Sequence, residues 1–566
     1  MTARPPTTGS RRPSLIVVAL IGVIALVVVV AATSLAAGMA MREAPPLALG
    51  APSFVDETAT AGLIQAYDGD WPYVVGGGVA ALDCDHDTRP DLYVAGGAAE
   101  AAMYRNASSV GGDLRFSAVH DPVTDMTSVI GAYPLDLEGD DETDLVVLRL
   151  GENVLLRGLG DCRFERANEA FSLDGGTAWT TSFSATWEGP ADLPTLAFGN
   201  YGGLDSRNNW DRTCIDGVLV RPDGAAGRYG APIALTPSWC TLSILFSDWD
   251  RSGRRDLRVS NDRHYYSDES DGEEQLWRVA EGETVRRYGR DEGWAKLRIW
   301  GMGIASQDLT GDGYPEVFLT SQADNKLQTL ADGPAQPTYR DIALSLGVTA
   351  HRPVVGGDPL ASTAWHAEFE DVNNDSFMDL FIAKGNVDAV PDSAARDPSN
   401  LFLAQTDGTF VESTVAAGVL SFAQGRGAAL IDLNLDGMLD LVVVNRRENV
   451  KVWRNAGTGS ADAPAPIGNW AAVSLVQDGP NHDAIGAWVS MRIGDRTIER
   501  EVTIGGGHAG GQLGPIHFGL GSADRASVRV HWPDGEIGPW QQLEANRYVT
   551  LERGTAEPRP WTIPEE

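Results

Sequence analysis

The segment GRGAALIDLNLDGMLDLVVVN, residues 425–445, decides the fold class. It consists of a glycine-rich apolar run, an acidic stretch and a second apolar run. The apolar runs are short and rich in valine, leucine and alanine, and no helical period passes through them. Two such runs joined by Asp, Asn and Gly residues predict a pair of antiparallel strands with a polar turn between them.

Five further copies of this unit are visible. They are GGGVAALDCDHDTRPDLYVAGG (76–97), GAYPLDLEGDDETDLVVLRL (131–150), LSILFSDWDRSGRRDLRVSND (242–262), GMGIASQDLTGDGYPEVFLTS (301–321) and AWHAEFEDVNNDSFMDLFIAKGN (364–386). They recur about every 50–60 residues, with one interval about twice as long. Residues 179–201, WTTSFSATWEGPADLPTLAFGNY, fill that interval and keep the strands without the acids.

Seven units of this size predict the fold. A repeat of about 50–60 residues with short strands and no helix period is typical of a propeller blade of four strands. We therefore expect an all-β fold with a seven-bladed β-propeller, whose closed ring protects its strand edges. A parallel β-helix is the alternative, but its repeats are shorter and more regular.

The six acidic loops share one spacing of oxygen-bearing side chains, at positions 1, 3, 5 and 9. We name each loop by its first residue. The predicted metal ligands are Asp83, Asp85, Asp87 and Asp91; Asp136, Glu138, Asp140 and Asp144; Asp248, Asp250, Ser252 and Asp256; Asp308, Thr310, Asp312 and Glu316; Asp371, Asn373, Asp375 and Asp379; and Asp432, Asn434, Asp436 and Asp440.

This spacing predicts calcium binding. Alternating oxygen ligands can surround one ion, a glycine at position 6 permits the turn, and calcium prefers six to eight oxygens. Magnesium, which prefers a smaller octahedron, ranks second, and polar turns without any ion are the alternative. The Asp308 and Asp432 loops fit the pattern best, whereas the Asp136 loop, with Asp141 at position 6, departs from it most.

Composition narrows the choice of partners. The chain has 566 residues with 78 acids against 44 bases, for a formal charge of −34. Because phosphate binding requires a basic surface, nucleic acid is excluded as a partner. The excess of acids is compatible with cation binding, and with an acidic, solvated surface.

The N-terminus predicts export. Residues 15–41 are uncharged and long enough to cross a bilayer core of about 30 Å. Arg4, Arg11 and Arg12 precede them, so residues 1–14 should stay cytoplasmic and the rest of the chain should face outward. A cleaved signal peptide, with small residues at Gly38 and Ala40, is the alternative and would give a secreted protein.

Four cysteines fit an oxidising compartment, since none of them forms a CxxC motif. Three disulfide connectivities are open. Cys214 and Cys240 are close in sequence and are the preferred pair, which leaves Cys84 with Cys162.

The C-terminal region reads as a separate β-domain. We expect a linker at 42–52, the propeller at 53–456, a small-residue linker at 457–468, the β-domain at 469–553 and a tail at 554–566. Four motifs of the β-domain, NHDAIGAWVSMRI (481–493), GGGHAGGQ (505–512), IHFGLG (516–521) and VRVHWPDG (528–535), together resemble the ASPIC/UnbV domain.

The combination resembles the cartilage acidic protein family, in which this domain follows VCBS/FG-GAP-like repeats. FVDETATAGL (54–63) and FVESTVAAGV (410–419) resemble the family's segment between blades. The resemblance implies calcium-binding, secreted or surface proteins and implies no reaction. One departure is GGGHAGGQ, where the family pattern has an aromatic residue and a serine.

Three functions follow as hypotheses. The first is a calcium-stabilised extracytoplasmic module for adhesion or for binding an extracellular protein or glycan. The second is a propeller enzyme, a lyase or hydrolase acting on polysaccharide or another extracellular substrate, with His366 and Glu368 as candidate groups. The third is a purely structural envelope protein. The first is favoured because the sequence contains no GxSxG, P-loop or HExxH motif.

Overall fold

The computed structural model describes residues 49–203, 213–224, 227–263, 272–388 and 390–563. The predicted cytoplasmic segment and the predicted anchor at 15–41 lie outside these residues and stay predictions. No helix within the described ranges has the length and hydropathy to cross a membrane.

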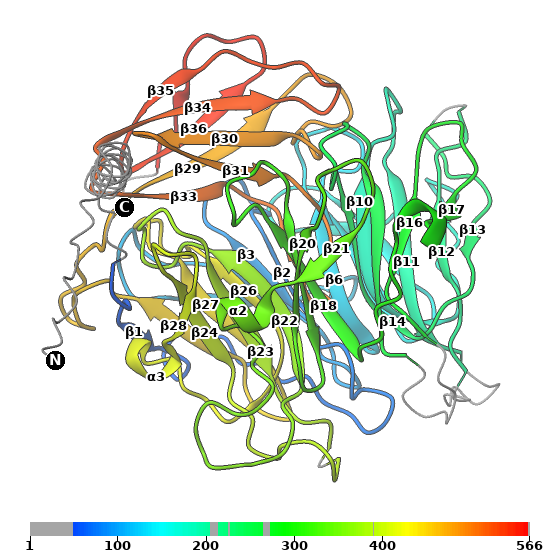
Figure 1. Ribbon diagram of the computed structural model, residues 1–566, viewed down its shortest axis with the longest axis horizontal. Coiled ribbons are helices and arrows are strands. Elements are labelled where there is room, and N and C mark those ends of the chain that lie inside the picture. The colour runs from blue at the N-terminus through cyan, green and yellow to red at the C-terminus, as the bar shows by residue number, and fades with distance from the viewer. Residues whose placement is uncertain (1–48, 204–212, 225–226, 264–271, 389, 564–566) are drawn as a thin grey trace, which may run out of the picture. The chain divides into compact units, whose positions relative to one another are not determined.

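The structure is almost entirely β (Figure 1). From Phe54 to Asn455, the described residues form seven antiparallel sheets of consecutive strands. The first three are β2 (Val79–Leu82), β3 (Asp91–Val94), β4 (Ala102–Asn106) and β5 (Phe116–Val119); β6 (Val129–Leu135), β7 (Asp144–Arg149), β8 (Val154–Gly158) and β9 (Phe164–Arg166); and β10 (Trp179–Thr186), β11 (Thr195–Gly202), β12 (Gly217–Val220) and β13 (Ile233–Leu235).

The next three sheets repeat the pattern. They are β14 (Thr241–Ser247), β15 (Asp256–Asn261), β16 (Gln275–Arg278) and β17 (Arg286–Arg287); β18 (Gly301–Gln307), β19 (Glu316–Ser321), β20 (Lys326–Leu330) and β21 (Tyr339–Asp341); and β22 (Ala364–Glu370), β23 (Asp379–Lys384), β24 (Asn400–Ala404) and β25 (Phe410–Glu412). Residues 179–201, predicted as the copy without acids, accordingly form the first two strands of the third sheet.

The seventh sheet joins the two ends of the repeat region. Its strands β26 (Gln424–Ile431), β27 (Asp440–Arg446) and β28 (Lys451–Asn455) come from the last repeat, and its outer strand β1 (Phe54–Asp56) comes from the beginning. The first strands of neighbouring sheets contact one another in order, from β2 through β6, β10, β14, β18 and β22 to β26, which contacts β2 again. This closed arrangement agrees with the expectation of an all-β, propeller-like fold.

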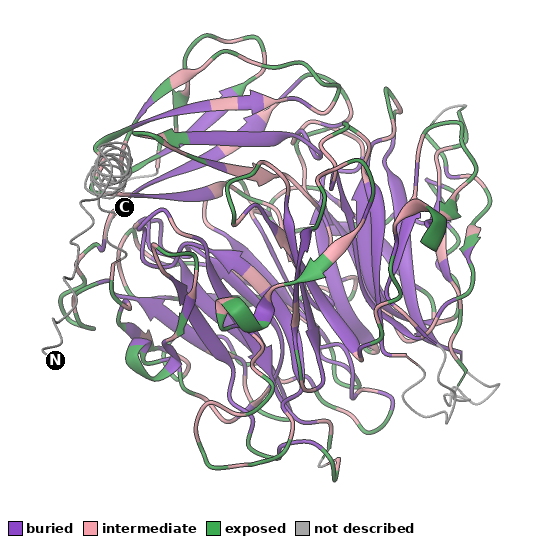
Figure 2. Cartoon of the chain, in the orientation of Figure 1, coloured by how far each residue is buried: buried purple, intermediate pink, exposed green. Residues whose placement is uncertain are grey.

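The first strands are buried on both faces because each sheet packs between two others. All seven residues of β6 and all eight of β10 are buried. Figure 2 shows the same for most strands of the ring, whereas exposed residues lie mainly in the loops. This explains why β6 and β10 contain only apolar or aromatic residues and small hydroxyl-bearing residues and carry no charge.

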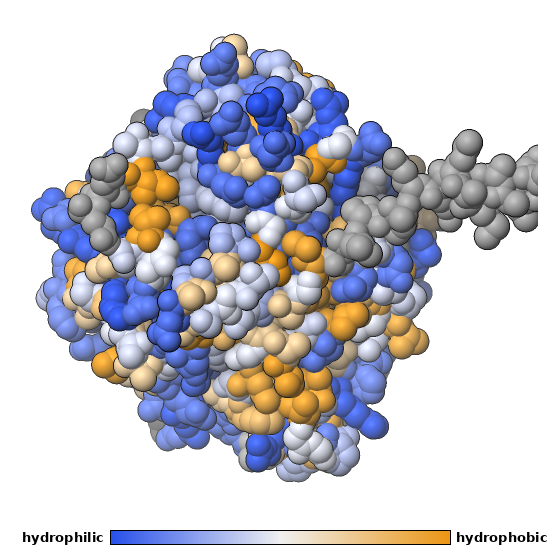
Figure 3. All heavy atoms as spheres, turned by 90° about the vertical axis from the view of Figure 1, so that its left-hand side faces the viewer, coloured by the Kyte–Doolittle hydropathy of each residue, from blue (hydrophilic) through white to orange (hydrophobic). Residues whose placement is uncertain are grey.

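Short helices between sheets were not predicted from the sequence. They are the 3-10 turn Arg290–Glu292 (η1), α2 (Ala343–Leu346) and α3 (Thr414–Ala417). The two α-helices end at Gly347 and Gly418, whose φ angles of 86° and 84° are left-handed and stop the helix. The side chains of Val411, Val415 and Leu420, near α3, are exposed. Figure 3 shows the face on the left-hand side of Figure 1, where apolar residues gather in the lower part of the view.

The C-terminal region forms two further sheets around its own core. One contains β29 (Asn469–Val476), β33 (Ile516–Gly521), β36 (Arg547–Glu552) and β37 (Arg559–Pro560); the other contains β30 (Trp488–Ile493), β31 (Arg496–Glu501), β34 (Arg525–His531) and β35 (Gln541–Glu544). We call this region the cap. Strand β37 lies in the segment predicted as a tail, where it pairs with β36.

One loop of the cap enters the ring. Residues 503–515, which we call the axial loop, include β32 (Gly511–Gln512), which pairs in parallel with β2. Isolated bridges join the same loop to the first strands of four other sheets, β6, β10, β14 and β18. The backbone N–H of His508 also donates to His366 Nδ1 on β22. The axial loop therefore lies among the first strands of the sheets.

Candidate metal centres in the acidic loops

The six acidic loops adopt the same turn. Each connects the first and second strands of its sheet. In every loop, Oδ2 of the first aspartate accepts the backbone N–H of the sixth residue at 2.5–3.1 Å. The sixth residue has a positive φ in all six, including Thr88, Asp141 and Ser376 at 75°, 70° and 71°. Replacing glycine at position 6 has therefore not changed the turn.

The ninth residue fastens the loop to its sheet. In the Asp432 loop, Asp440 Oδ2 accepts the N–H of Leu433 at 3.0 Å, and Oδ1 accepts the N–H of Asn455 on β28 at 2.8 Å. Asp91, Asp144 and Asp379 make the same two contacts in their loops. A carboxylate at position 9 thus has a structural role in addition to its predicted role as a ligand.

The carboxylates at position 1 are held in surroundings that oppose their charge. Burial raises the pKa of Asp308 to about 6. Burial, followed by the charge of Asp436, raises the pKa of Asp432 to about 7. Negative charge kept here at neutral pH costs free energy, which a bound cation would offset.

Two oxygen atoms in the loops are buried and lack a hydrogen-bond partner among the described residues. They are Asp248 Oδ1, at position 1, and Asn434 Oδ1, at position 3. Buried acceptors are normally satisfied, so each requires a donor or a cation. An all-oxygen set with unpaired acceptors fits calcium, which would be held by positions 1, 3 and 5 and would supply positive charge to the loop.

Arginine side chains divide the loops into two groups. Arg105 Nε lies 2.9 Å from Asp85 Oδ2, Arg157 Nε lies 2.9 Å from Glu138 Oε1, and Arg254 Nη2 lies 3.3 Å from Asp250 Oδ2. Among the described residues, no lysine or arginine forms an ion pair with a predicted ligand in the Asp308, Asp371 or Asp432 loops. Arg496 acts on Asp371, Asp375 and Asp308 from a greater distance, as Arg454 does on Asp436, so these three loops differ from the others in having no direct ion pair within the described residues.

These arginines were not identified from the sequence. Arg105 and Arg157 lie on β4 and β8, away from the loops that they reach, so only the folded sheet brings them there. Arg254 is at position 7 of its own loop, where a basic residue was visible in the sequence.

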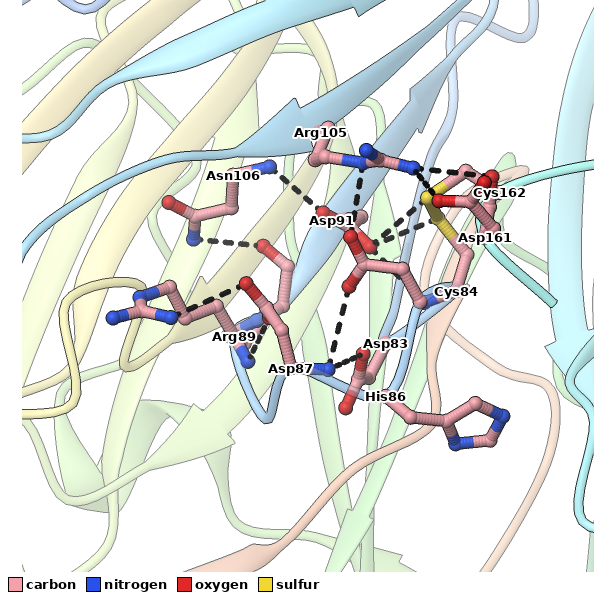
Figure 4. Close-up of a disulfide and its surroundings, with 12 residues drawn as sticks. Asp83, Cys84, His86, Asp87, Arg89, Asp91, Arg105, Asn106, Asp161 and Cys162 are labelled. Carbon is pink, nitrogen blue, oxygen red and sulfur yellow. Dashed lines mark hydrogen bonds and ion pairs between the residues drawn. A yellow bond between two sulfur atoms is a disulfide. The ribbon is translucent and has the colours of Figure 1, made fainter. Parts of the chain in front are cut away.

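The Asp83 loop is also tied to the second sheet. Cys84, at its position 2, is bonded to Cys162, which lies in the turn after β8 (Figure 4). The second disulfide joins Cys214 and Cys240, so the preferred connectivity is confirmed.

Oxygens of Asp83, Asp85 and Asp87 lie within 4.8 Å of one another. Asp91 Oδ2 lies 2.8 Å from Cys84 Sγ, a packing contact since a disulfide sulfur has no proton to donate.

The pair His366 and Glu368 takes part in holding the axial loop. His366 Nε2 lies 3.3 Å from Glu368 Oε2, and Nδ1 accepts the N–H of His508 at 3.1 Å. Glu368 also accepts from Gln512 at 2.6 Å and from the N–H of Leu430 at 3.1 Å. Both ring nitrogens of His366 are engaged in polar contacts. These contacts give His366 and Glu368 a structural role in holding the axial loop. A cavity of about 230 Å³ lies beside it.

Comparison with known families agrees with this architecture. Residues 371–443, which contain the Asp371 and Asp432 loops, match the FG-GAP-like repeat, and residues 477–558 match ASPIC and UnbV. The chain carries an FG-GAP-like repeat and an ASPIC/UnbV domain. It is similar to cartilage acidic protein 1 of Mus musculus, with 27% identity over 224 residues, which cover 36% of this chain and 31% of that protein. The matched region is thus under a third of the mouse protein.

Similar solved structures share little sequence with the chain. The BBS1N chain crystallised with ARL6DN has 12% identity and a TM-score of 0.40, covering 72% of this chain and 99% of that one. An N-acetylglucosamine-recognising protein of Agrocybe aegerita has 15% identity and a TM-score of 0.38, covering 68% and 92%. PorZ of Porphyromonas gingivalis has 12% identity and a TM-score of 0.39, covering 86% and 60%.

Proposed function

We propose that this chain is a calcium-binding, extracytoplasmic binding module, built as a seven-bladed β-propeller closed by its ASPIC/UnbV cap. The observation that carries the proposal is the shared geometry of six loops. Each places the first aspartate over the same left-handed turn, and two of the loops leave a ligand oxygen buried without a partner. Polar turns that bind no ion have no need of buried acceptor oxygens that lack a donor.

The compartment and the partner follow from other features. Two disulfides fit an oxidising environment outside the cytoplasm, with residues 15–41 as the membrane anchor. The FG-GAP-like repeat and the ASPIC/UnbV domain favour adhesion-type binding of an extracellular protein or glycan. A glycan and protein array probed with and without calcium would identify such a partner.

Calcium titration tests the proposal directly. The full chain, stripped with chelator and kept in detergent, should bind calcium saturably in a calorimeter. The Asp308, Asp371 and Asp432 loops should bind most tightly because, among the described residues, no lysine or arginine forms a direct ion pair with their predicted ligands. Asp432→Asn should remove one tight site, since it deletes the charge at position 1.

The matched control is Asp407→Asn, at an exposed turn between β24 and β25 whose carboxylate contacts only Thr409. This variant should bind as much calcium as the wild type. Absence of calcium binding, or equal loss in the two variants, would overturn the proposal.

A further inference from the structure

The cap sits against the acidic loops. The Tyr548 hydroxyl donates to Asp432 Oδ2, the first predicted ligand of its loop. The ring of Trp470 covers Gly437, at position 6 of the same loop, so closely that a Cβ on that glycine would lie 1.7 Å from the indole. His517 Nε2 lies 2.6 Å from Asn374 Oδ1 in the Asp371 loop. Three cap side chains therefore contact two of the three loops whose predicted ligands form no direct ion pair with a described lysine or arginine.

Strand β31 of the cap contacts two more loops. Glu501 accepts the backbone N–H of Asp248 at 2.8 Å and the hydroxyl of Ser247 at 2.7 Å. The carbonyl of Glu499 accepts from the side chain of Gln307, which immediately precedes the Asp308 loop, at 2.7 Å. The cap is thus positioned by residues within the loops or directly before them.

Like charges meet at this contact. The Glu501 carboxylate of the cap lies directly against Asp248, the first predicted ligand of its loop, whose backbone N–H it accepts. Carboxylates that face one another across a buried contact repel unless a cation lies nearby. Arg251 and Arg500 supply part of this positive charge through their pairs with Glu499 and Glu370, and filled calcium loops would add to it on the ring side of the interface.

The same strand leads directly into the axial loop. Strand β31 ends at Glu501, two residues before the axial loop begins. The N–H groups of Gly506 and Gly507 donate to the carbonyls of Ile244 and Ile304 at 2.8 and 2.7 Å. Glycines of the first strands make room for the loop, since a Cβ at Gly78 or Gly131 would lie 1.7 Å from the carbonyl oxygen of Ala509. Movement of β31 would therefore carry the axial loop with it.

We propose that calcium in the loops locks the cap onto the ring and so keeps the axial loop seated between the first strands. Removal of calcium releases the cap and opens the centre of the ring, while the sheets themselves persist. This inference rests on the calcium binding proposed above and adds a conformational consequence to it.

Hydrogen exchange on the full chain, with calcium and with excess chelator, tests the proposal. Without calcium, the axial loop should exchange about tenfold faster or more, whereas the middle strands β7 and β15 should keep their protection. Unchanged protection of the axial loop, or simultaneous loss in every strand, would refute the lock. Calcium binding is measured separately by calorimetry, so a chain that binds no calcium refutes the proposed function instead.

Two matched glycine variants test the lock in saturating calcium. Gly437→Ala and Gly313→Ala place the same side chain at position 6 of two loops, with φ of 83° and 88°, and so introduce similar backbone strain. Only the first collides with the cap, because a Cβ at Gly313 meets no atom within 4 Å. Gly437→Ala should accelerate exchange of the axial loop by about tenfold, and Gly313→Ala should leave it unchanged.

A milder variant covers the case in which Gly437→Ala does not fold. Tyr548→Phe removes only the hydroxyl that contacts Asp432, and it should raise the calcium concentration at which the axial loop becomes protected. Wild-type exchange in both Gly437→Ala and Tyr548→Phe would show that the cap is seated independently of the loops.

Discussion

At the scale of residues, the sixth position shows what a sequence pattern conveys and what it hides. Glycine there was expected because it permits the turn, and Asp141 looked like a departure; Thr88 and Ser376 also stand in place of glycine. All three adopt the left-handed conformation nonetheless. The hydrogen bond from the backbone N–H of the sixth residue to the first aspartate holds the turn. These residues therefore keep the loop geometry at the cost of backbone strain.

Relief of that strain gives a testable effect. Ser376→Gly should stabilise the protein by up to about 1 kcal/mol, because glycine removes a left-handed penalty of about 1–2 kcal/mol and loses part of the gain to chain entropy. Ser376→Ala keeps the penalty and is the control. Urea unfolding at fixed calcium compares them. A glycine variant no more stable than the alanine variant would show that position 6 is unstrained.

The predicted ligands also show which contacts a sequence pattern reveals and which it does not. Positions 1, 3 and 5 could be identified from their alternation, since each loop is a continuous stretch. The guanidinium groups of Arg105 and Arg157 could not, because their strands reach the loops only through sheet pairing. The contact of Tyr548 with Asp432 spans 116 positions of sequence and leaves no local pattern at all.

At the scale of elements, the strands were the most predictable part. Apolar runs ending in acidic turns located the first two strands of each repeat, and even the copy without acids at 179–201 formed β10 and β11. In that copy Trp187 and Thr195 occupy the places of the first and ninth acids. The short helices escaped prediction because four residues are too few to show a helical period.

Closure of the ring depends on strand β1. Its pairing with β28 is reinforced by Glu57, directly after the strand, whose Oε1 lies 2.7 Å from Arg454 Nε with both side chains buried. Glu57 Oε2 also accepts the N–H of Leu114, next to the first sheet. The acid therefore links the two ends of the repeat region.

Glu57→Ala should destabilise the protein by about 3 kcal/mol, since it removes the closest partner of the buried Arg454 guanidinium, which keeps only the weaker contacts with Asp113 at 3.4 Å and the carbonyl of Ala461. The control is Lys451→Ala, which breaks the neighbouring pair with Asp56, where both partners are partly exposed. Its cost should be about 1 kcal/mol or less. Denaturant unfolding monitored by tryptophan fluorescence measures both, and equal costs would argue against a closing role for Glu57.

At the scale of the molecule, the ring and the cap act as one assembly. The β-domain was predicted as a separate unit behind a linker, yet its axial loop lies among the first strands of the sheets. The glycines at the start of several repeats are visible in the sequence. Their role, however, is to make room for a loop that lies more than 370 residues from Gly131 in the sequence. Tertiary contacts of this kind cannot be predicted from one sequence without the fold.

The calcium requirement is tested most directly by thermal unfolding of the full chain in millimolar calcium and in excess EGTA. Sites that bind only the folded state stabilise it by about 2.7 kcal/mol each at a hundredfold excess over Kd. Chelation should therefore lower the melting temperature by roughly 10 °C or more, and added calcium should restore it. Superimposable melting curves with and without EGTA would contradict the account, because six acidic loops would then be stable without a cation.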